Sequence, residues 1–414
     1  MFFITMLLWA SLSFAQDIKK YDYVGVYSEG LARVQLNGKF GFIDKTGKKV
    51  IPLKYDKVES FSEGLVAVKF NAKYGFIDKT GKKVIPLKYD KVESFSEGLV
   101  VVALNNKYGF INKKGKTVIP LKYDYAESFS EGLALVGLDG KWGYIDTTGN
   151  EVIPLKYHDT LGYSEGLVAV QFNDKWGYID TTTGNEVIPL KYDWVYDFHE
   201  GLAPVKLNDK WGYIDKTDNE IIPLKYDYAE SFSEGLALVE LNDKWGYIDT
   251  TGKEIIPLKY DEAMDFHESL AAVRLNGRWG FIDMTGKEVI PLKYDVAGDF
   301  YESLAVVGLN YKWGYIDKIG NEVVPLRYDE ANNFREGLAA VELNDKCGFI
   351  NKAGNEVIPL KYDVAMYFHE GRAKVILGNR EFYIDKNGNE IKDGKKIKGL
   401  RLPSISPTNQ KQEK

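Results

Sequence analysis

The hexapeptide KWGYID at residues 141–146 decides the fold, because it recurs along the chain at an almost constant spacing. Its aromatic position repeats every 34 residues, except for one step of 35 between Trp176 and Trp211, where the turn at 181–184 carries an extra residue. The eleven positions of this column are Phe40, Tyr74, Tyr108, Trp142, Trp176, Trp211, Trp245, Trp279, Trp313, Cys347 and Glu381. Self-similarity at a fixed period of roughly 20–50 residues is typical of a repeat architecture.

Two further segments recur in the same phase. The heptapeptide VIPLKYD at 50–56 has counterparts in ten copies, and the tripeptide EGL at 29–31 has counterparts in all eleven. The terminal copies are incomplete, as expected of repeats that cap a stacked array. We therefore assign residues 16–393 to one array of eleven units, with the recognisable repeats beginning at residue 21.

One unit, residues 31–56, shows how the repeat folds. Residues 31–36 alternate between apolar and other side chains, which is typical of a half-buried strand. The dipeptide Asn37-Gly38 predicts a type I′ hairpin leading into a second strand at 40–45. After the Thr46-Gly47 turn, residues 48–52 form a third strand. The residues that follow connect to the next unit, and nothing in the repeat has a helical period.

Two small features of the unit predict close contacts. Gly41 beside the aromatic position would let a neighbouring backbone or ring approach closely, and Pro52 should lie at a sheet edge or strand end because it cannot donate to a ladder. The Asp of the Tyr-Ile-Asp segment precedes a Thr-Gly turn and suits an Asx-type turn.

Three short strands cannot bury an apolar face alone, so the units must stack on one another. We predict an all-β, open superhelical β-solenoid of about eleven three-stranded antiparallel units. The alternative is a closed, propeller-like ring. Propellers usually have about four to eight four-stranded blades and repeats of roughly 40 residues or more, so eleven units of 34 residues favour the open array.

The units resemble the WG repeats, also written KWG repeats, of bacterial proteins, and the similarity covers nearly all of the chain after the N-terminal leader. The resemblance implies a repetitive, β-rich family that is largely without an assigned activity. The first three copies depart from the pattern with Phe or Tyr in place of Trp, and two late copies have lost the aromatic. We interpret the tryptophans of the column as structural: Trp142, Trp176, Trp211, Trp245, Trp279 and Trp313.

Composition excludes several function classes. The 60 acidic and 54 basic residues give a net charge of −6, which argues against a general nucleic-acid binder. A single cysteine excludes a disulfide framework and a cysteine-ligated metal site.

Both ends differ from the array. Residues 1–15 are apolar and end in the small-x-small sequence Ser13-Phe14-Ala15, which predicts a cleaved signal peptide and an exported protein, whether periplasmic, cell-surface or extracellular. The alternative is a buried apolar N-terminal strand. Residues 394–414 are basic, polar and off-period, and we predict that they are disordered. A short basic arm that touches an anionic surface is the other interpretation.

Residues that could carry catalysis follow the repeat columns. His199, His267 and His369 occupy one column in which other copies have serine, and the glutamate column from Glu29 to Glu370 recurs in every unit. A catalytic site needs unlike environments that a column does not supply. We therefore predict no enzyme activity, no metal and no cofactor.

The connectors after Tyr-Asp vary most from copy to copy. Five aromatic residues appear in them without following the repeat, and these are the candidate binding residues: Trp194, Tyr196, Tyr125, Tyr228 and Tyr367. Solenoids bind along surfaces built by successive units, so we predict a scaffold that binds a protein or glycan partner at the cell envelope. Drift on a tolerant surface, a purely structural spacer, and an enzyme with a site in the connectors are the alternatives.

Overall fold

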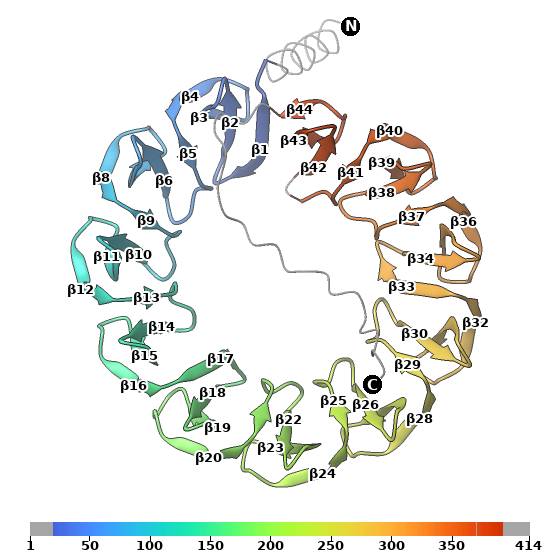
Figure 1. Cartoon of the computed structure of the whole chain (residues 1–414). Coiled ribbons are helices and arrows are strands. Elements are labelled where there is room, and N and C mark those ends of the chain that lie inside the picture. The colour runs from blue at the N-terminus through green and yellow to red at the C-terminus, as the bar shows by residue number, and fades with distance from the viewer. Residues whose placement is uncertain (1–19, 370, 392–414) are drawn as a thin grey trace, which may run out of the picture.

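The computed structural model describes residues 20–369 and 371–391, and in this part of the chain the fold is a ring of eleven β-sheet blades (Figure 1). Each blade is an antiparallel sheet of four strands that follow one another in the sequence. The blades surround a central opening, and the fourth strands lie on the outer rim (Figure 1). The predicted signal peptide at 1–15 and the basic tail at 394–414 lie outside the described residues.

The strands occupy four positions from the inside of the ring to the outside. The first, inner strands are β1 (Tyr23–Ser28), β5 (Lys57–Val58), β9 (Lys91–Val92), β13 (Tyr125–Ala126), β17 (Asp159–Ser164), β21 (Trp194–Val195), β25 (Tyr228–Ala229), β29 (Glu262–Ala263), β33 (Val296–Tyr301), β37 (Glu330–Ala331) and β41 (Val364–Ala365). The second strands are β2 (Leu31–Leu36), β6 (Leu65–Phe70), β10 (Leu99–Leu104), β14 (Leu133–Leu138), β18 (Leu167–Phe172), β22 (Leu202–Leu207), β26 (Leu236–Leu241), β30 (Leu270–Leu275), β34 (Leu304–Leu309), β38 (Leu338–Leu343) and β42 (Arg372–Leu377). The third strands are β3 (Lys39–Asp44), β7 (Lys73–Asp78), β11 (Lys107–Asn112), β15 (Lys141–Asp146), β19 (Lys175–Asp180), β23 (Lys210–Asp215), β27 (Lys244–Asp249), β31 (Arg278–Asp283), β35 (Lys312–Ile316), β39 (Lys346–Asn351) and β43 (Arg380–Asp385). The fourth, outer strands are β4 (Lys49–Tyr55), β8 (Lys83–Tyr89), β12 (Thr117–Tyr123), β16 (Glu151–Tyr157), β20 (Glu186–Tyr192), β24 (Glu220–Tyr226), β28 (Glu254–Tyr260), β32 (Glu288–Tyr294), β36 (Glu322–Tyr328), β40 (Glu356–Tyr362) and β44 (Glu390–Ile391).

The prediction of an open solenoid of three-stranded units is wrong, because the connector between units contains a fourth strand. In β5, Lys57 and Val58 pair with Lys69 and Val68 of β6, so the connector completes the sheet of the following unit. A 34-residue period therefore holds a whole propeller blade. The architecture is an eleven-bladed β-propeller.

Neighbouring blades pack on one another through a shared apolar core. Small side chains such as Ala67 on β6 pack near the inside, whereas Phe76 on β7 and Tyr89 on β8 pack farther out. Val100 and Ile111 of the next blade pack against these side chains in the same core. Eleven blades joined in this way form a ring in which the last blade lies next to the first (Figure 1).

The Trp-Gly pair of the repeat is fixed by a close backbone approach. A Cβ atom added to Gly143 would lie 2.5 Å from the carbonyl oxygen of Ile153 on the outer strand β16. The same clash would occur at the equivalent glycine of the other complete blades. The prediction of a close approach at this glycine is confirmed, and so is the placement of proline at an edge, because Pro52 lies in the outer strand β4.

The glutamate column links successive blades. Glu29, with a positive φ of 49°, accepts a hydrogen bond from the backbone N–H of Gly64 at 3.1 Å and pairs with Lys79 at 2.9 Å, both in the next blade. The aspartate column forms the predicted Asx-type turns, in which the Thr46 N–H donates to Asp44 Oδ1 at 2.8 Å. Both columns are structural, as their repetition indicates.

Candidate binding surface on the inner rim

The five predicted binding residues all lie at the inner edge of the ring. Tyr125, Trp194 and Tyr228 begin the two-residue inner strands β13, β21 and β25, while Tyr196 and Tyr367 follow β21 and β41 closely. Because every inner strand occupies the same position in its blade, side chains far apart in the sequence share one rim.

The rings on blades 6 and 7 form a continuous aromatic run, which we define as Tyr196, Trp211, Tyr228 and Trp245. Tyr196 stacks on Trp211 with ring centroids 5.3 Å apart and an interplanar angle of 11°. Tyr228 lies between the two tryptophans, 6.1 Å from Trp211 and 5.6 Å from Trp245. The run therefore crosses from one blade to the next without a break.

The other predicted residues each pack on a neighbour from the preceding blade. Trp194 packs edge to face on Trp176, with ring centroids 5.4 Å apart. The Tyr125 ring centroid lies 5.3 Å from that of Trp142 in its own blade and 6.2 Å from that of Tyr108 in the preceding blade. The Arg335 guanidinium lies 4.6 Å from the Tyr367 ring centroid.

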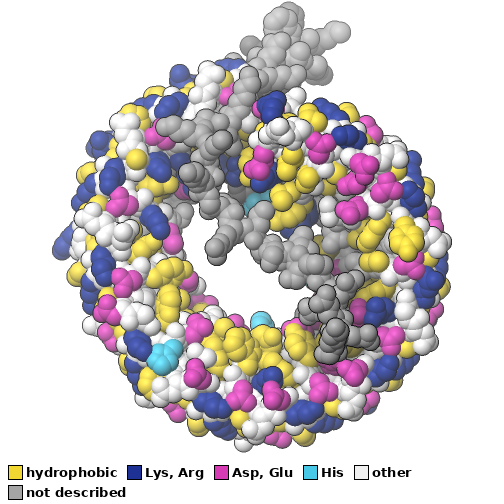
Figure 2. Space-filling model, in the orientation of Figure 1, with side chains coloured by type: hydrophobic (Ala, Val, Ile, Leu, Met, Phe, Trp, Pro, Cys, Tyr) yellow, Lys and Arg dark blue, Asp and Glu magenta, His cyan; other side chains and the backbone are white. Residues whose placement is uncertain are grey.

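These connector aromatics stay accessible at the same time, with 40% exposure for Tyr125 and Trp194 and 45% for Tyr367. Figure 2 shows hydrophobic side chains gathered along the inner rim over the blades of β17 to β26, with a smaller group over β13.

The tryptophan column lies beneath this rim. Trp176, Trp211 and Trp279 are buried, whereas Trp142, Trp245 and Trp313 are half-buried. Sequence reasoning treated the whole column as structural and missed that Trp211 and Trp245 extend the aromatic run. Their column follows the repeat, so only the contact with Tyr196 and Tyr228 distinguishes them.

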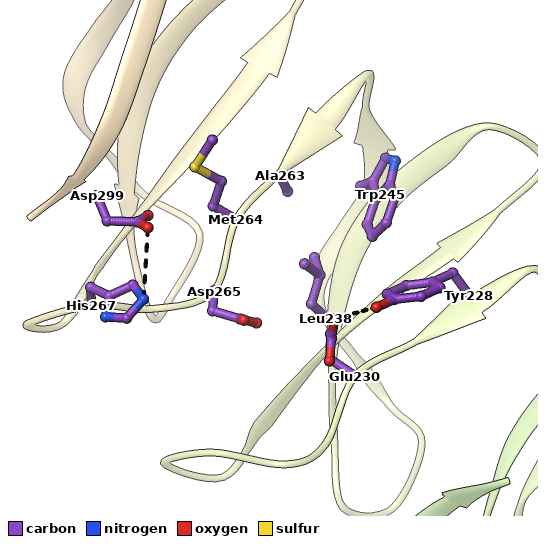
Figure 3. Close-up of a pocket in the computed structure, with 9 residues that line it drawn as sticks. All are labelled: Tyr228, Glu230, Leu238, Trp245, Ala263, Met264, Asp265, His267 and Asp299. Carbon is purple, nitrogen blue, oxygen red and sulfur yellow. Dashed lines mark hydrogen bonds and ion pairs between the residues drawn. The ribbon is translucent and has the colours of Figure 1, made fainter. Parts of the chain in front are cut away.

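A pocket of about 340 Å³ adjoins one end of the aromatic run (Figure 3). Tyr228 and Trp245 line one side, Asp265 and Met264 come from the connector after β29, and Asp299 comes from β33. Sequence reasoning did not select the aspartates. The signal was present, since Asp197, Asp265 and Asp299 occupy a column in which four copies have serine: Ser60, Ser94, Ser128 and Ser231.

The carboxyl groups in this pocket differ in exposure, since Asp265 is exposed whereas Asp299 and Glu230 are half-buried. Burial raises the pKa of Asp299, although the neighbouring His267 opposes that shift. Asp299 Oδ1 is fully buried and accepts no hydrogen bond from the described residues, while Oδ2 lies 3.7 Å from His267 Nε2. Partial desolvation raises the pKa of Asp265, the His267 charge opposes that shift, and the Asp299 charge adds to it. On the other side of the pocket, the Tyr228 hydroxyl donates to the Glu230 carboxylate (Figure 3).

The remaining chemically active side chains are dispersed. His199, His267 and His369 belong to different blades, and within residues 20–369 and 371–391 no three His, Cys, Asp or Glu side chains are grouped so that they could hold a metal ion. Cys347 occupies the tryptophan column, where burial and a hydrogen bond to Glu342 raise the pKa of its thiol to about 11. No helix among the described residues is long and apolar enough to cross a membrane.

Comparison with known proteins identifies the repeat. A family model described as "WG containing repeat" matches eleven segments: 18–40, 40–74, 74–108, 108–142, 142–176, 176–211, 211–245, 245–279, 279–313, 313–347 and 348–380. No curated protein sequence matches the chain significantly.

Solved propeller structures resemble the chain only distantly. A eukaryotic initiation factor is 11% identical with a TM-score of 0.36, covering 71% of this chain and 95% of its own. The extracellular domain of a putative hybrid two-component system from B. thetaiotaomicron is 9% identical with a TM-score of 0.24, covering 89% and 70%. PorZ, a surface component of the type-IX secretion system of Porphyromonas gingivalis, is 9% identical with a TM-score of 0.25, covering 90% and 58%. At these values the similarities carry no information about function.

Proposed function

The chain belongs to the family of WG-containing repeats, and from that membership and the geometry of the inner rim we propose that it is an exported, non-catalytic scaffold that binds a protein or glycan partner at the cell envelope. The observation that carries this proposal is the aromatic run of Tyr196, Trp211, Tyr228 and Trp245. Export is proposed from the apolar leader at residues 1–15.

The physical reason is the kind of contact that stacked aromatic rings provide. Tyr and Trp offer large, stiff surfaces with little side-chain entropy to lose, and their polar atoms orient a ligand. A run that crosses two blades matches a ligand that is itself extended, such as a polypeptide segment or a chain of sugar rings. The glutamate and aspartate columns, by contrast, are occupied by contacts that hold the blades and turns together.

The proposal is tested by partner retention on the immobilised full-length protein. The double change Trp194→Ala with Tyr196→Ala should weaken retention of components from a cell-envelope extract by about 2 kcal/mol or more. The matched control is Tyr311→Ala, because Tyr311 is 95% exposed in the hairpin between β34 and β35, away from the inner strands. Equal retention by the double variant, the control and the unmodified protein would favour a purely structural spacer.

An enzyme is the second candidate, favoured by one observation. Asp265 and Asp299 are carboxyl groups with raised pKa values in one pocket, which is the environment of a general acid. If the pocket is catalytic, envelope polysaccharide incubated with the protein releases new reducing ends, and Asp299→Asn abolishes the release. A scaffold releases none.

A further inference from the structure

We propose that the pocket between blades 7, 8 and 9 binds a cationic side chain, a lysine ammonium or an arginine guanidinium, presented by a polypeptide partner. The inference rests on the proposed function and selects a protein partner with a basic segment over a neutral glycan. Its basis is the combination of aromatic walls, three carboxylates and an open cavity in one place (Figure 3).

The pocket brings together acidic groups from three successive blades. Glu230 follows β25, Asp265 follows β29 and Asp299 belongs to β33, and all three line the same cavity. In Figure 3 the Asp265 side chain extends from its connector into the space between the His267–Asp299 pair and the Tyr228–Glu230 pair. A cation in this space meets carboxylates on both sides.

The charges that line the pocket are not balanced by the protein's own cations. Among the lining residues only His267 can become positive, and it faces Asp299 from a position where its side chain is 42% exposed. Arg274 on the adjacent strand β30 is engaged elsewhere, since it pairs with Glu262 at 2.5 Å and lies over Trp279. Asp265 is exposed, and Glu230 and Asp299 are half-buried, so their negative charges repel one another at the mouth of the cavity, and a bound cation relieves that repulsion.

The aromatic wall fits the same class of ligand. Tyr228 and Trp245 lie 5.6 Å apart on one side of the cavity, and the faces of such rings attract ammonium and guanidinium groups. The Tyr228 hydroxyl donates to Glu230, which fixes that carboxylate at the rim of the pocket. A neutral sugar could stack on the rings but would leave the carboxylates uncompensated.

The repeat itself indicates that the cluster is particular to this place. The column of Asp265 and Asp299 holds serine in most early copies, and two aspartates occur in consecutive blades only here. Asp197 occupies the same column in blade 6, where burial also raises its pKa, yet it does not line the pocket. It therefore supplies a control carboxylate from the same column that lies outside the pocket.

The test uses the full-length protein and a fluorescein-labelled pentalysine peptide at low salt, followed by fluorescence anisotropy. The isosteric double change Asp265→Asn with Asp299→Asn should weaken pentalysine binding by about tenfold or more, the size expected when charge-assisted hydrogen bonds are lost. Asp197→Asn should bind as tightly as the unmodified protein. A labelled pentaglutamine peptide should not bind any of the three.

The proposal is overturned if the double variant binds pentalysine as tightly as the unmodified protein, or if Asp197→Asn weakens binding equally, which would indicate general surface charge. The outcome is separable from that of the proposed function. Suppose that Trp194→Ala with Tyr196→Ala abolishes retention of an envelope partner, while the change at Asp265 and Asp299 leaves pentalysine binding unaltered. That result supports the scaffold and contradicts the cation pocket. The reverse result supports the pocket and contradicts partner binding at Trp194 and Tyr196.

Discussion

At the scale of single residues, the informative positions in this ring are of two kinds: those that keep the residue type of their repeat column and those that depart from it. The Trp-Gly pair belongs to the first kind. Gly143 faces the backbone of β16 so closely that no side chain fits, which explains why the repeat keeps glycine beside an aromatic that itself varies.

Gly143→Ala should therefore destabilise the protein by about 1–3 kcal/mol, because the added Cβ forces the outer strand to move. The control is Gly162→Ala in β17, where the nearest atom to an added Cβ is Asp197 Oδ2 at an ordinary 3.5 Å. Thermal melting of both variants checks the prediction. Similar melting temperatures for the two would show that the close approach does not constrain the fold.

The pocket aspartate Asp299 belongs to the second kind, and its titration gives a prediction with a definite sign. Its pKa in the folded protein is raised above the ordinary 3.8, so the folded state binds the proton more tightly than the unfolded chain does. That contribution favours folding below pH 3.8 and is lost as pH rises through the raised pKa. Asp299→Asn should consequently raise the melting temperature at pH 7 and leave it unchanged well below pH 3.8.

Asp215 provides the opposite case. Hydrogen bonds, the largest from Asn219, lower the pKa of Asp215 to about 2. Its contribution is present above the ordinary pKa of 3.8 and disappears as pH falls toward about 2, so Asp215→Asn should lower the melting temperature at pH 7. If both Asn variants shift melting in the same direction at pH 7, the environments described for the two carboxyls are wrong.

Part of the candidate surface could be predicted from these residues and part could not. Trp194, Tyr196, Tyr125, Tyr228 and Tyr367 departed from their columns, and the structure places all of them on the inner rim. Asp265 and Asp299 also depart from the serine of their column, but the signal is weaker, because serine, asparagine and aspartate all suit a connector. Trp211 and Trp245 carried no signal, since their contacts with Tyr196 and Tyr228 depend on packing across blades.

At the scale of elements, the two-residue inner strand is the difference between the expected three-stranded solenoid unit and the observed four-stranded propeller blade. The alternation that predicts a strand needs at least four residues, and β5 has only Lys57 and Val58. The longer strands, the Asn-Gly hairpin and the proline edge were all predictable because their signals are local. Asn37 and Gly38 adopt the positive φ values, 50° and 71°, that the hairpin requires.

Contact between blades makes a prediction at this scale. Trp211 is 5% exposed and packs against blade 7, so Trp211→Ala should cost about 3–5 kcal/mol of unfolding free energy. Trp194 is 40% exposed on the rim, and Trp194→Ala should cost far less. Denaturant unfolding measures both, and equal losses would mean that the rim aromatics are structural rather than available to a ligand.

At the scale of the whole molecule, the blades that the structure describes form a ring in which no sheet joins the two ends of the chain. Each of the eleven blades there is built from four consecutive strands, and none combines strands from the two ends of the chain. The number of blades could be predicted from the repeats, whereas the ring could not, because ring formation depends on the small angle between each blade and the next.

Export also belongs to the whole molecule. We predict that expression in a bacterial host yields a mature protein that begins near Gln16, because Ser13-Phe14-Ala15 ends the apolar leader. N-terminal sequencing checks this, and cytoplasmic protein that retains Met1 would contradict it.

An inner rim exists only if the blades close into a ring in solution, and small-angle X-ray scattering of the full-length protein measures this directly. A closed eleven-bladed ring gives a distance distribution that ends at the ring diameter and a profile that the ring fits. An open superhelix gives a distribution with a long tail beyond that diameter. We predict the distribution of the closed ring. A long tail would contradict the account, because the aromatic surface and the cation pocket both depend on a shared inner rim.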